Sequence, residues 1–228
     1  MNKRWEILPI DEKKQILLEK NLHISSSLAE ILTRKNLDEN SAKLFLNPTK
    51  IPYHDPFLLK DMEKACQRLL LALKNKEKIC IYGDYDVDGV SSTALLMTVF
   101  TKLGFNIDYY LPDRHSEGYG LHIESLQKLI PKYDLLITVD CGITALDEVD
   151  YAKDKIDMII TDHHLPREIL PDAFAIINPT QTQCNYPNKN LCGAVVAFKF
   201  ACALYESFSF PKEEAEELLE FAAIATVG

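Results

Sequence analysis

Acidic and imidazole side chains follow three short apolar runs of the chain, in each case where the run ends. The first cluster, Asp84-Tyr85-Asp86-Val87-Asp88-Gly89, comes after residues 79–82, and the second, Asp140-Cys141-Gly142, comes after 135–139. The third cluster, Asp162-His163-His164, follows a similar run. Carboxylates packed this tightly repel one another, and a hard divalent cation is the usual partner that makes them stable. Together the three clusters predict a single metal site.

The elements that must position these clusters alternate along the chain between strand-like and helical patterns. Strands are predicted at 79–82, 106–111, 135–139, 157–161 and 174–177. Helices are predicted at 90–102, 122–130, 143–154 and near 166–170. This alternation indicates an α/β fold, a parallel sheet with helices on both faces. Ligands of such sheets bind beyond the carboxyl ends of the strands, which is where the three clusters fall.

The N-terminal part of the chain has a different pattern. Residues 1–60 predict a small helical segment, and residues 61–228 predict the α/β domain, which ends in two helices within 193–227. Between these parts, the prolines Pro48, Pro52 and Pro56 predict an extended stretch that is either a hinge or a wrap.

The amino-acid composition limits how the chain can bind nucleic acid. The formal charge is −9, which is not the footprint of a protein that grips many phosphates through a basic surface. Nucleic acid is not excluded as a substrate, because bound metal would offset part of the acidic charge. Trp5, Tyr53 and Phe57 could stack on bases, but burial in a core is the interpretation that we favour.

The sequence also indicates a compartment. No apolar run approaches the roughly 20 residues of a membrane-spanning helix, and the N-terminus lacks the pattern of a secretory signal. The six cysteines are scattered, without a Cys-x-x-Cys pair. We therefore expect a reducing, cytoplasmic environment and no membrane association.

Two other interpretations of the first cluster fail on local detail. A calcium loop that began at Asp84 would need a glutamate at its twelfth position, where the chain has Leu95, and it would need a preceding helix. Asp86-Val87-Asp88-Gly89 also resembles the motif of haloacid-dehalogenase-like phosphotransferases. In that family the nucleophile sits directly at the strand end, whereas Gly83-Asp84-Tyr85 intervene here.

The ordered set of motifs resembles the DHH phosphoesterase family, and its RecJ branch in particular. The triplet 162–164 gives the family its name, while 83–89 and 139–142 are similar to the first two motifs of that branch. Further RecJ-like stretches are His54–Phe57, Leu111–Arg114, Glu117–Gly120, Ile177–Pro179, Leu191–Ala194 and Ala197–Lys199. The resemblance covers most of residues 20–228.

This resemblance implies a metal-dependent phosphodiesterase. The activity expected is 5′ to 3′ exonuclease action on single-stranded DNA, in repair and recombination, with two Mn²⁺ or Mg²⁺ ions. The implied metal ligands are Asp86, Asp88, Asp140 and His163. Many relatives carry a histidine where Tyr82 stands, so that ligand position is absent here.

Other residues have open roles. Asp84 is a further ligand or a base beside the metals, and Asp162 is expected to orient its neighbours. His164 either ligates metal or stabilises charge on the phosphate in the transition state. Arg114 is expected to grip a phosphate with its fork of donors.

Gly193 leaves two alternatives open. It either begins a helix whose amides face a phosphate or permits close packing.

The end of the chain carries a further expectation. Relatives of this family have a fourth motif with another metal-binding aspartate, and we expect residues 1–228 to be the N-terminal part of a longer protein that holds the single strand. Two alternatives remain: a DHH enzyme for short oligonucleotides or cyclic dinucleotides, and a non-catalytic domain that binds metal or a partner.

Overall fold

The computed structural model describes residues 9–48 and 53–228. The chain divides into two compact units, Met1–Tyr53 and His54–Gly228. Trp5 and Pro52 lie outside the described residues. Tyr53 is 66% exposed, so its predicted burial is wrong, whereas Phe57 packs against the core of the second unit.

The first unit contains three short helices, α1 (Glu12–Leu22), α2 (Ser26–Arg34) and α3 (Glu39–Leu46). Each helix begins after a residue whose side chain accepts a hydrogen bond from the first turn, namely Asp11, Ser25 and Asp38. Such caps satisfy amides that have no partner within the helix. The helices share a small apolar core made by Leu18, Ala29, Leu32 and Ala42.

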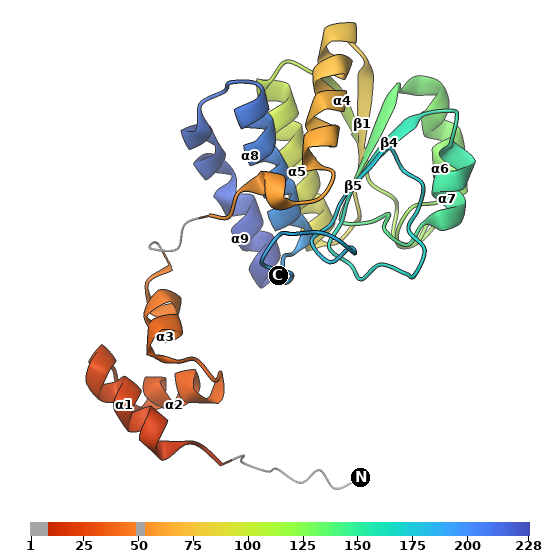
Figure 1. The fold of residues 1–228 in the computed structure, drawn as a ribbon. Helices are drawn as coiled ribbons and strands as arrows, with labels where there is room; N and C mark the ends of the chain where they lie inside the picture. The colour runs from red at the N-terminus through yellow and green to blue at the C-terminus, as the bar shows by residue number, and fades with distance from the viewer. Residues whose placement is uncertain (1–8, 49–52) are drawn as a thin grey trace, which may run out of the picture. The chain divides into compact units, whose positions relative to one another are not determined.

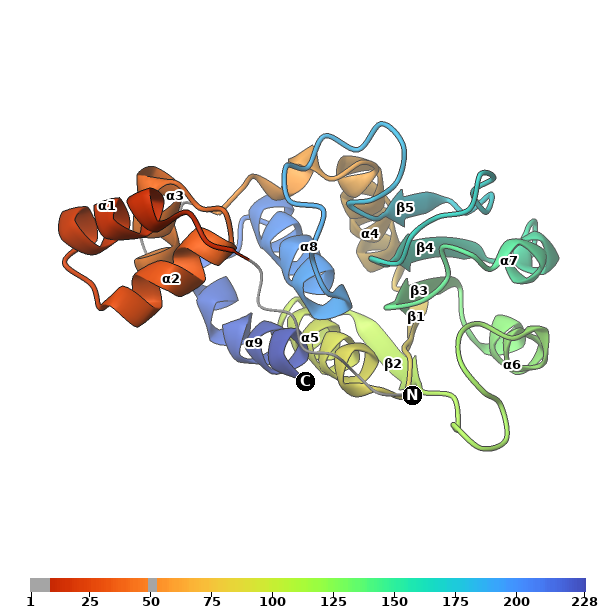
Figure 2. The same ribbon diagram turned by 90° about the horizontal axis from the view of Figure 1, so that it is seen from below.

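The second unit is built on a five-stranded sheet in the order β2-β1-β3-β4-β5 (Figures 1 and 2). Its strands are β1 (Lys78–Tyr82), β2 (Asn106–Tyr110), β3 (Leu135–Val139), β4 (Asp157–Thr161) and β5 (Ala175–Ile177). Every neighbouring pair is parallel. The predicted parallel sheet is therefore confirmed, and the strands that carry the three clusters are adjacent.

Helices cover both faces of this sheet, as predicted (Figure 2). One face packs against α4 (Met62–Asn75), α5 (Val87–Lys102) and α8 (Gly193–Ser207), with α9 (Leu219–Val227) beside α5 and α8. The other face packs against α6 (Ile123–Leu129) and α7 (Leu146–Ala152). Short 3₁₀ turns complete the unit at Pro56–Leu58, Ile130–Lys132 and Lys212–Leu218.

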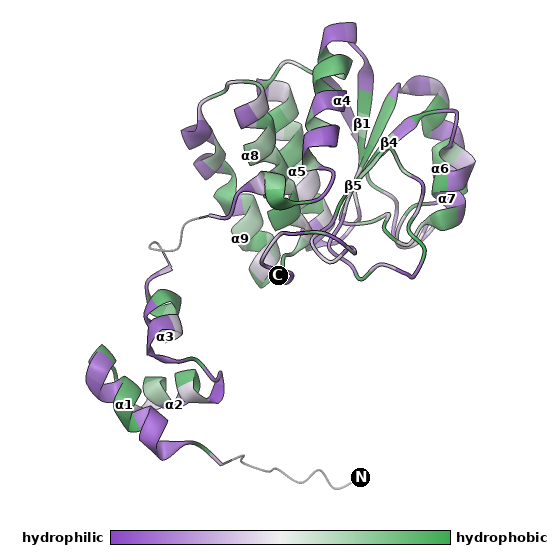
Figure 3. Ribbon diagram, viewed as in Figure 1, coloured by the Kyte–Doolittle hydropathy of each residue, from purple (hydrophilic) through white to green (hydrophobic). Residues whose placement is uncertain are grey.

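Alternation along the strands builds these two layers. Ile79 and Ile81 of β1 belong to the core under α4, α5 and α8, while Cys80 and Tyr82 belong to the core under α6 and α7. A strand buried on both faces is apolar at successive positions, and β1 is accordingly largely green in Figure 3. The three strands that carry the clusters are therefore buried at their carboxyl ends.

Two predicted helices differ from the structure. Residues 166–170 form no helix, because Pro166 and Pro171 leave only a short segment between them and the residue before a proline disfavours helical backbone. The helix expected at 143–154 spans only Leu146–Ala152. Its missing start is a turn in which the Ala145 amide donates to the Gly142 carbonyl.

Across residues 9–48 and 53–228, no helix is long and apolar enough to cross a membrane. All six cysteines are free thiols.

Candidate metal centre

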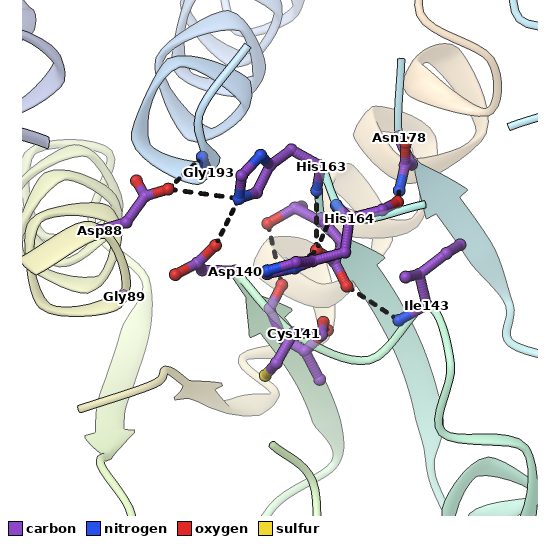
Figure 4. Close-up of polar contacts among 12 residues, drawn as sticks. Asp88, Gly89, Asp140, Cys141, Ile143, His163, His164, Asn178 and Gly193 are labelled. Carbon is purple, nitrogen blue, oxygen red and sulfur yellow. Dashed lines mark hydrogen bonds and ion pairs between the residues drawn. The ribbon is translucent and has the colours of Figure 1, made fainter. Parts of the chain in front are cut away.

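The three clusters converge at the carboxyl edge of β1, β3 and β4. Asp84 and Asp86 follow β1, Asp140 follows β3, and His163 and His164 follow β4. Figure 4 shows His163 between Asp88, at the start of α5, and Asp140. Strand order alone therefore brings together residues that lie up to 80 positions apart in the sequence, as His164 and Asp84 do.

Two sets of ligand atoms at this edge are each compact enough to surround one ion. Asp84, Asp86 and Asp140 form the first set, and Asp140, His163 and His164 form the second, with ligand atoms within 4.8 Å of one another in each set. Asp140 belongs to both sets. A carboxylate has two oxygens, so Asp140 has one oxygen available for each set.

Asp84 is the residue whose surroundings most clearly call for a cation. Its side chain is fully buried, and neither carboxylate oxygen has a hydrogen-bond partner in the described part of the chain. Burial, together with the nearby charge of Asp86, raises the pKa of Asp84. A buried carboxylate without partners is costly, and a divalent ion would supply the missing partner. The residues present therefore fit a metal centre.

Asp140 has an unusual backbone as well as a buried side chain. Its φ of 59° lies in the left-handed region, which few residues other than glycine, asparagine and aspartate adopt. His163 Nε2 lies 3.1 Å from Asp140 Oδ1. Burial raises the pKa of Asp140 to about 7, although the contact with His163 partly opposes this rise.

Asp88 is already engaged by the protein. Its two carboxylate oxygens accept hydrogen bonds from the amides of Gly193 (2.6 Å) and Ala194 (2.7 Å), at the start of α8. One of these oxygens also lies 3.4 Å from His163 Nε2. Asp88 belongs to neither compact ligand set, so its predicted role as a ligand stays a prediction. What the structure shows is a carboxylate that ties α8 to the metal centre.

The same contact decides between the two alternatives for Gly193. Its amide faces Asp88, and a Cβ at this position would lie 2.7 Å from Asp140 Oδ1. Gly193 therefore permits close packing, and its amide is not directed at a vacant phosphate position.

Asp86 shapes the loop after β1. Its Oδ1 accepts hydrogen bonds from the amides of Asp88 (2.9 Å) and Gly89 (3.0 Å) and so caps α5. This cap explains why α5 begins at Val87, earlier than the predicted residue 90. It also fixes the carboxylate in the first ligand set.

Asp162 orients its neighbours, in agreement with its expected role. Its side chain is 1% exposed and accepts hydrogen bonds from the amides of Ile143, His163 and His164. His164 Nδ1 lies 2.7 Å from Asp162 Oδ1. Burial opposes ionisation of Asp162, but these hydrogen bonds outweigh it and lower the pKa. The same pairing raises the pKa of His164 to about 8.

Arg114 lies apart from the carboxylates, in the loop between β2 and α6. Its guanidinium carbon lies 5.4 Å from the centroid of the Tyr85 ring. The acidic neighbours in this loop are occupied elsewhere, since Asp113 accepts from the amides of His115 and Ser116 and Glu117 accepts from the Tyr110 hydroxyl. Within residues 9–48 and 53–228, Arg114 forms no ion pair.

Sequence reasoning gave no structural role to two tyrosines of this centre. Tyr82 donates a hydrogen bond to the Gly120 carbonyl (2.9 Å) and so supports the loop of Arg114. Tyr119 reaches His164, with 3.1 Å between its hydroxyl and Nε2. The signal for Tyr119 was its position between Gly118 and Gly120, both of which have positive φ.

A cavity of about 740 Å³ lies beside the centre. His164, Asp162 and Tyr119 line it on one side, and the residues at the start of α7 line it on another. Among the residues of the two ligand sets, only His164 lines this cavity.

Comparison with known proteins agrees with this geometry. Residues 78–226 match the model of the N-terminal domain of the DHH family. The single-stranded-DNA-specific exonuclease RecJ of Bacillus subtilis (strain 168) is 43% identical over 227 residues, which are 98% of this chain and 28% of that protein. The chain therefore spans less than a third of the length of this curated relative.

Solved structures give the same result. The crystal structure of exonuclease RecJ bound to manganese is 34% identical, with a TM-score of 0.68, over 74% of this chain and 43% of that one. The structure of RecJ in complex with Mn²⁺ from Thermus thermophilus is 27% identical, with a TM-score of 0.77, over 98% of this chain and 31% of that one. The family match covers all the strand ends that make up the candidate metal centre. The chain belongs to the DHH family.

Proposed function

We propose that this chain carries the metal centre of a 5′ to 3′ exonuclease that hydrolyses single-stranded DNA with two Mn²⁺ or Mg²⁺ ions. The observation that carries the proposal is the pair of ligand sets that share Asp140, with the buried and unpartnered Asp84 in one of them. If these acids had only structural roles, no reason would exist for two ligand sets that share one carboxylate. Two sets joined by one carboxylate are what a two-metal hydrolase requires.

The relatives support the substrate and the metal. The Bacillus subtilis relative is named a single-stranded-DNA-specific exonuclease, and the two solved RecJ structures hold manganese. The donors in this chain, carboxylate oxygens and imidazole nitrogens, suit Mn²⁺ and Mg²⁺ better than a soft metal. Action on single-stranded DNA in repair and recombination, with polarity from the 5′ end, is part of the proposal for the whole protein.

We assign the residues as follows. Asp84, Asp86, Asp140 and His163 would hold the ions. Asp88 would be a further ligand, and its carboxylate also anchors α8. When bound, such ions stabilise the charge on a phosphodiester and activate water for attack. His164, held by Asp162, stabilises charge on the phosphate as that charge develops in the transition state. Arg114 supplies a cation for a phosphate of the strand.

The charge of the chain bears on the partner. With a formal charge of −9, these residues do not provide the broad basic surface that grips long nucleic acid. Strand binding in the proposed enzyme would then depend on local cations such as Arg114. The free cysteines are compatible with the reducing, cytoplasmic location that we propose.

A nuclease assay on a 5′-phosphorylated single-stranded oligonucleotide with manganese tests the proposal. We expect mononucleotides to be released from the 5′ end, and we expect Asp140→Asn and His163→Ala to abolish the release. Calorimetric titration with Mn²⁺ should count two ions per chain. Hydrolysis confined to dinucleotides would favour the short-substrate alternative, and the absence of Mn²⁺ binding would favour a non-catalytic domain.

A further inference from the structure

Tyr119 joins the loop between β2 and α6 to the residues after β4. Its hydroxyl lies 3.1 Å from His164 Nε2 and 3.4 Å from the carbonyl oxygen of Asp140. The two rings meet edge to face, with centroids 5.9 Å apart. Tyr119 is 50% exposed, so its ring is not placed there by burial in a core.

The backbone around Tyr119 is built to hold the side chain in this position. Gly118 and Gly120 adopt φ of 82° and 89°, which favour glycine, and they turn the chain on either side of the ring. Tyr82 fixes Gly120 through its hydroxyl. The Tyr85 ring also packs edge to face on Tyr119, with centroids 6.4 Å apart.

His164 is therefore held from two directions. Asp162 accepts at Nδ1, at 2.7 Å, which places the ring proton on that nitrogen and leaves Nε2 toward Tyr119. A tyrosine hydroxyl can donate to Nε2 of a neutral ring, or accept from a charged one while it donates to the Asp140 carbonyl. The contact thus persists in either protonation state of the imidazole.

We propose that Tyr119 is a positioning residue that, with Asp162, fixes the imidazole of His164 for phosphodiester hydrolysis. This inference rests on the proposed function for its kinetic consequence, but not for the contact itself. A histidine that stabilises charge in the transition state must be positioned before the charge develops, because reorientation during the reaction costs rate. Asp162 supplies one anchor for the ring, and the hydroxyl of Tyr119 supplies the second.

A competing role for Tyr119 would be direct contact with the substrate. Its exposed ring could stack on a base, since aromatic side chains are common platforms for single strands. The two roles differ in one respect: a stacking residue acts without His164, whereas a positioning residue acts only through it.

A double-mutant cycle separates these roles. Wild type, Tyr119→Phe, His164→Ala and the double variant are compared for manganese-dependent hydrolysis of 5′-phosphorylated single-stranded DNA. We expect Tyr119→Phe to lower kcat about tenfold with little change in KM, and to add almost nothing when His164 is already alanine. Equal losses in both backgrounds, or no loss, would overturn the inference.

The matched control is Tyr109→Phe. Tyr109 is 54% exposed but lies on β2, outside the residues that contact His164. It should leave kcat and KM unchanged. Tyr119→Phe retains the ring and its contact with Tyr85, so thermal unfolding should match that of wild type.

A second measurement does not depend on activity. In the metal-free protein, the ¹⁵N resonance of His164 Nε2 should move when Tyr119 becomes phenylalanine, while the resonances of His54 should not. An unmoved His164 resonance would overturn the contact. If wild type failed to hydrolyse single-stranded DNA, the proposed function would fail while this resonance still decided the link between Tyr119 and His164.

Discussion

The backbone of Gly193 lies directly against the side chain of Asp140. A Cβ at position 193 would stand 2.7 Å from Asp140 Oδ1 and 2.9 Å from its Cβ and Cγ. Real Cβ atoms do not approach other atoms so closely, and Asp140 cannot retreat, because it is buried with a left-handed backbone. The start of α8 and the shared carboxylate are therefore fitted to each other.

Replacement of this glycine should damage the metal centre more than the fold. We expect Gly193→Ala to displace Asp140 and lower Mn²⁺ affinity by roughly tenfold or more, since a small shift of a ligand costs much of its binding. The control is Gly104→Ala, which strains a φ of 81° but meets no atom within 4 Å. That variant should lose about 1 kcal/mol of stability and no Mn²⁺ affinity by calorimetry.

Replacement of Asp84 should increase the stability of the metal-free protein and weaken metal binding. Because its buried oxygens have no partners and burial raises its pKa, ionised Asp84 destabilises the metal-free fold. Asp84→Asn should raise the free energy of unfolding at neutral pH by roughly 1–3 kcal/mol in chelator and abolish the stabilisation that Mn²⁺ gives. Denaturant titrations with chelator and with Mn²⁺ measure both quantities.

The control for Asp84 is Asp162→Asn. Asp162 is equally buried, but backbone amides and His164 already satisfy its oxygens. The same substitution should therefore destabilise the metal-free protein. If both variants shifted stability in the same direction, the environment of Asp84 would not be the cause.

Replacement of Asp88, unlike that of Asp84, should lower the stability of the metal-free protein. Asp88→Ala leaves the amides of Gly193 and Ala194 without their acceptors, and we expect a loss of about 1–2 kcal/mol of stability even in chelator. Asp88→Asn retains one acceptor and should lose less. Asp147→Ala, which removes an acid from the first turn of α7 but no cap hydrogen bond, should change stability by less than about 0.5 kcal/mol.

The fold was predictable because the buried strands have apolar sequences. The runs 135–139 and 157–161 match β3 and β4 to the residue, because a strand buried on both faces carries a continuous apolar stretch that ends where polar residues begin. The helix expected near 166–170 failed because Pro166 and Pro171 outweigh the residues between them. The early start of α5 depends on the cap by Asp86, a contact visible in the sequence only as one more acid.

The candidate site was predictable in its composition but not in its supports. Asp84, Asp140 and His163 stand at strand ends, and parallel strands place such ends together. The hydrogen bonds from α8 to Asp88 span 105 residues, and the contact of Tyr119 with His164 spans 45. No local pattern marks such pairs, because they arise from how helices and loops pack on the finished sheet.

Arg114 should act on substrate binding more than on the chemical step. Its guanidinium packs on Tyr85, directly after Asp84, which places a cation beside the loop that carries the first ligand set. We expect Arg114→Ala to raise KM for 5′-phosphorylated DNA by roughly tenfold, with a smaller change in kcat. Arg114→Lys should restore only part of the lost substrate affinity, because lysine lacks the fork of donors. Arg34→Ala, which breaks a pair with Glu30 in the first unit, is the control and should leave KM unchanged. A loss in kcat alone would contradict this role.

Metal affinity should rise with pH through the neutral range. Burial raises the pKa of Asp140 to about 7, so below this value the carboxyl holds a proton that an ion must displace. The pairing with Asp162 raises the pKa of His164 to about 8, and protonated His164 repels a cation. Both groups therefore act in the same direction: protonation at low pH weakens binding, and the affinity levels off once both have lost their protons.

Calorimetry with Mn²⁺ between about pH 6 and about pH 9 tests this linkage, because binding at the lower pH should release more protons than at the higher one. His164→Ala should remove the rise in affinity that occurs above neutrality and leave the part that belongs to Asp140. Since a folded-state pKa raised above the ordinary value of histidine stabilises the fold only while the imidazole is charged, the metal-free protein should lose stability as pH rises through about 8. Affinity that stayed constant over this range would mean that Asp140 is ionised without the metal, and the buried carboxylate would then need another partner.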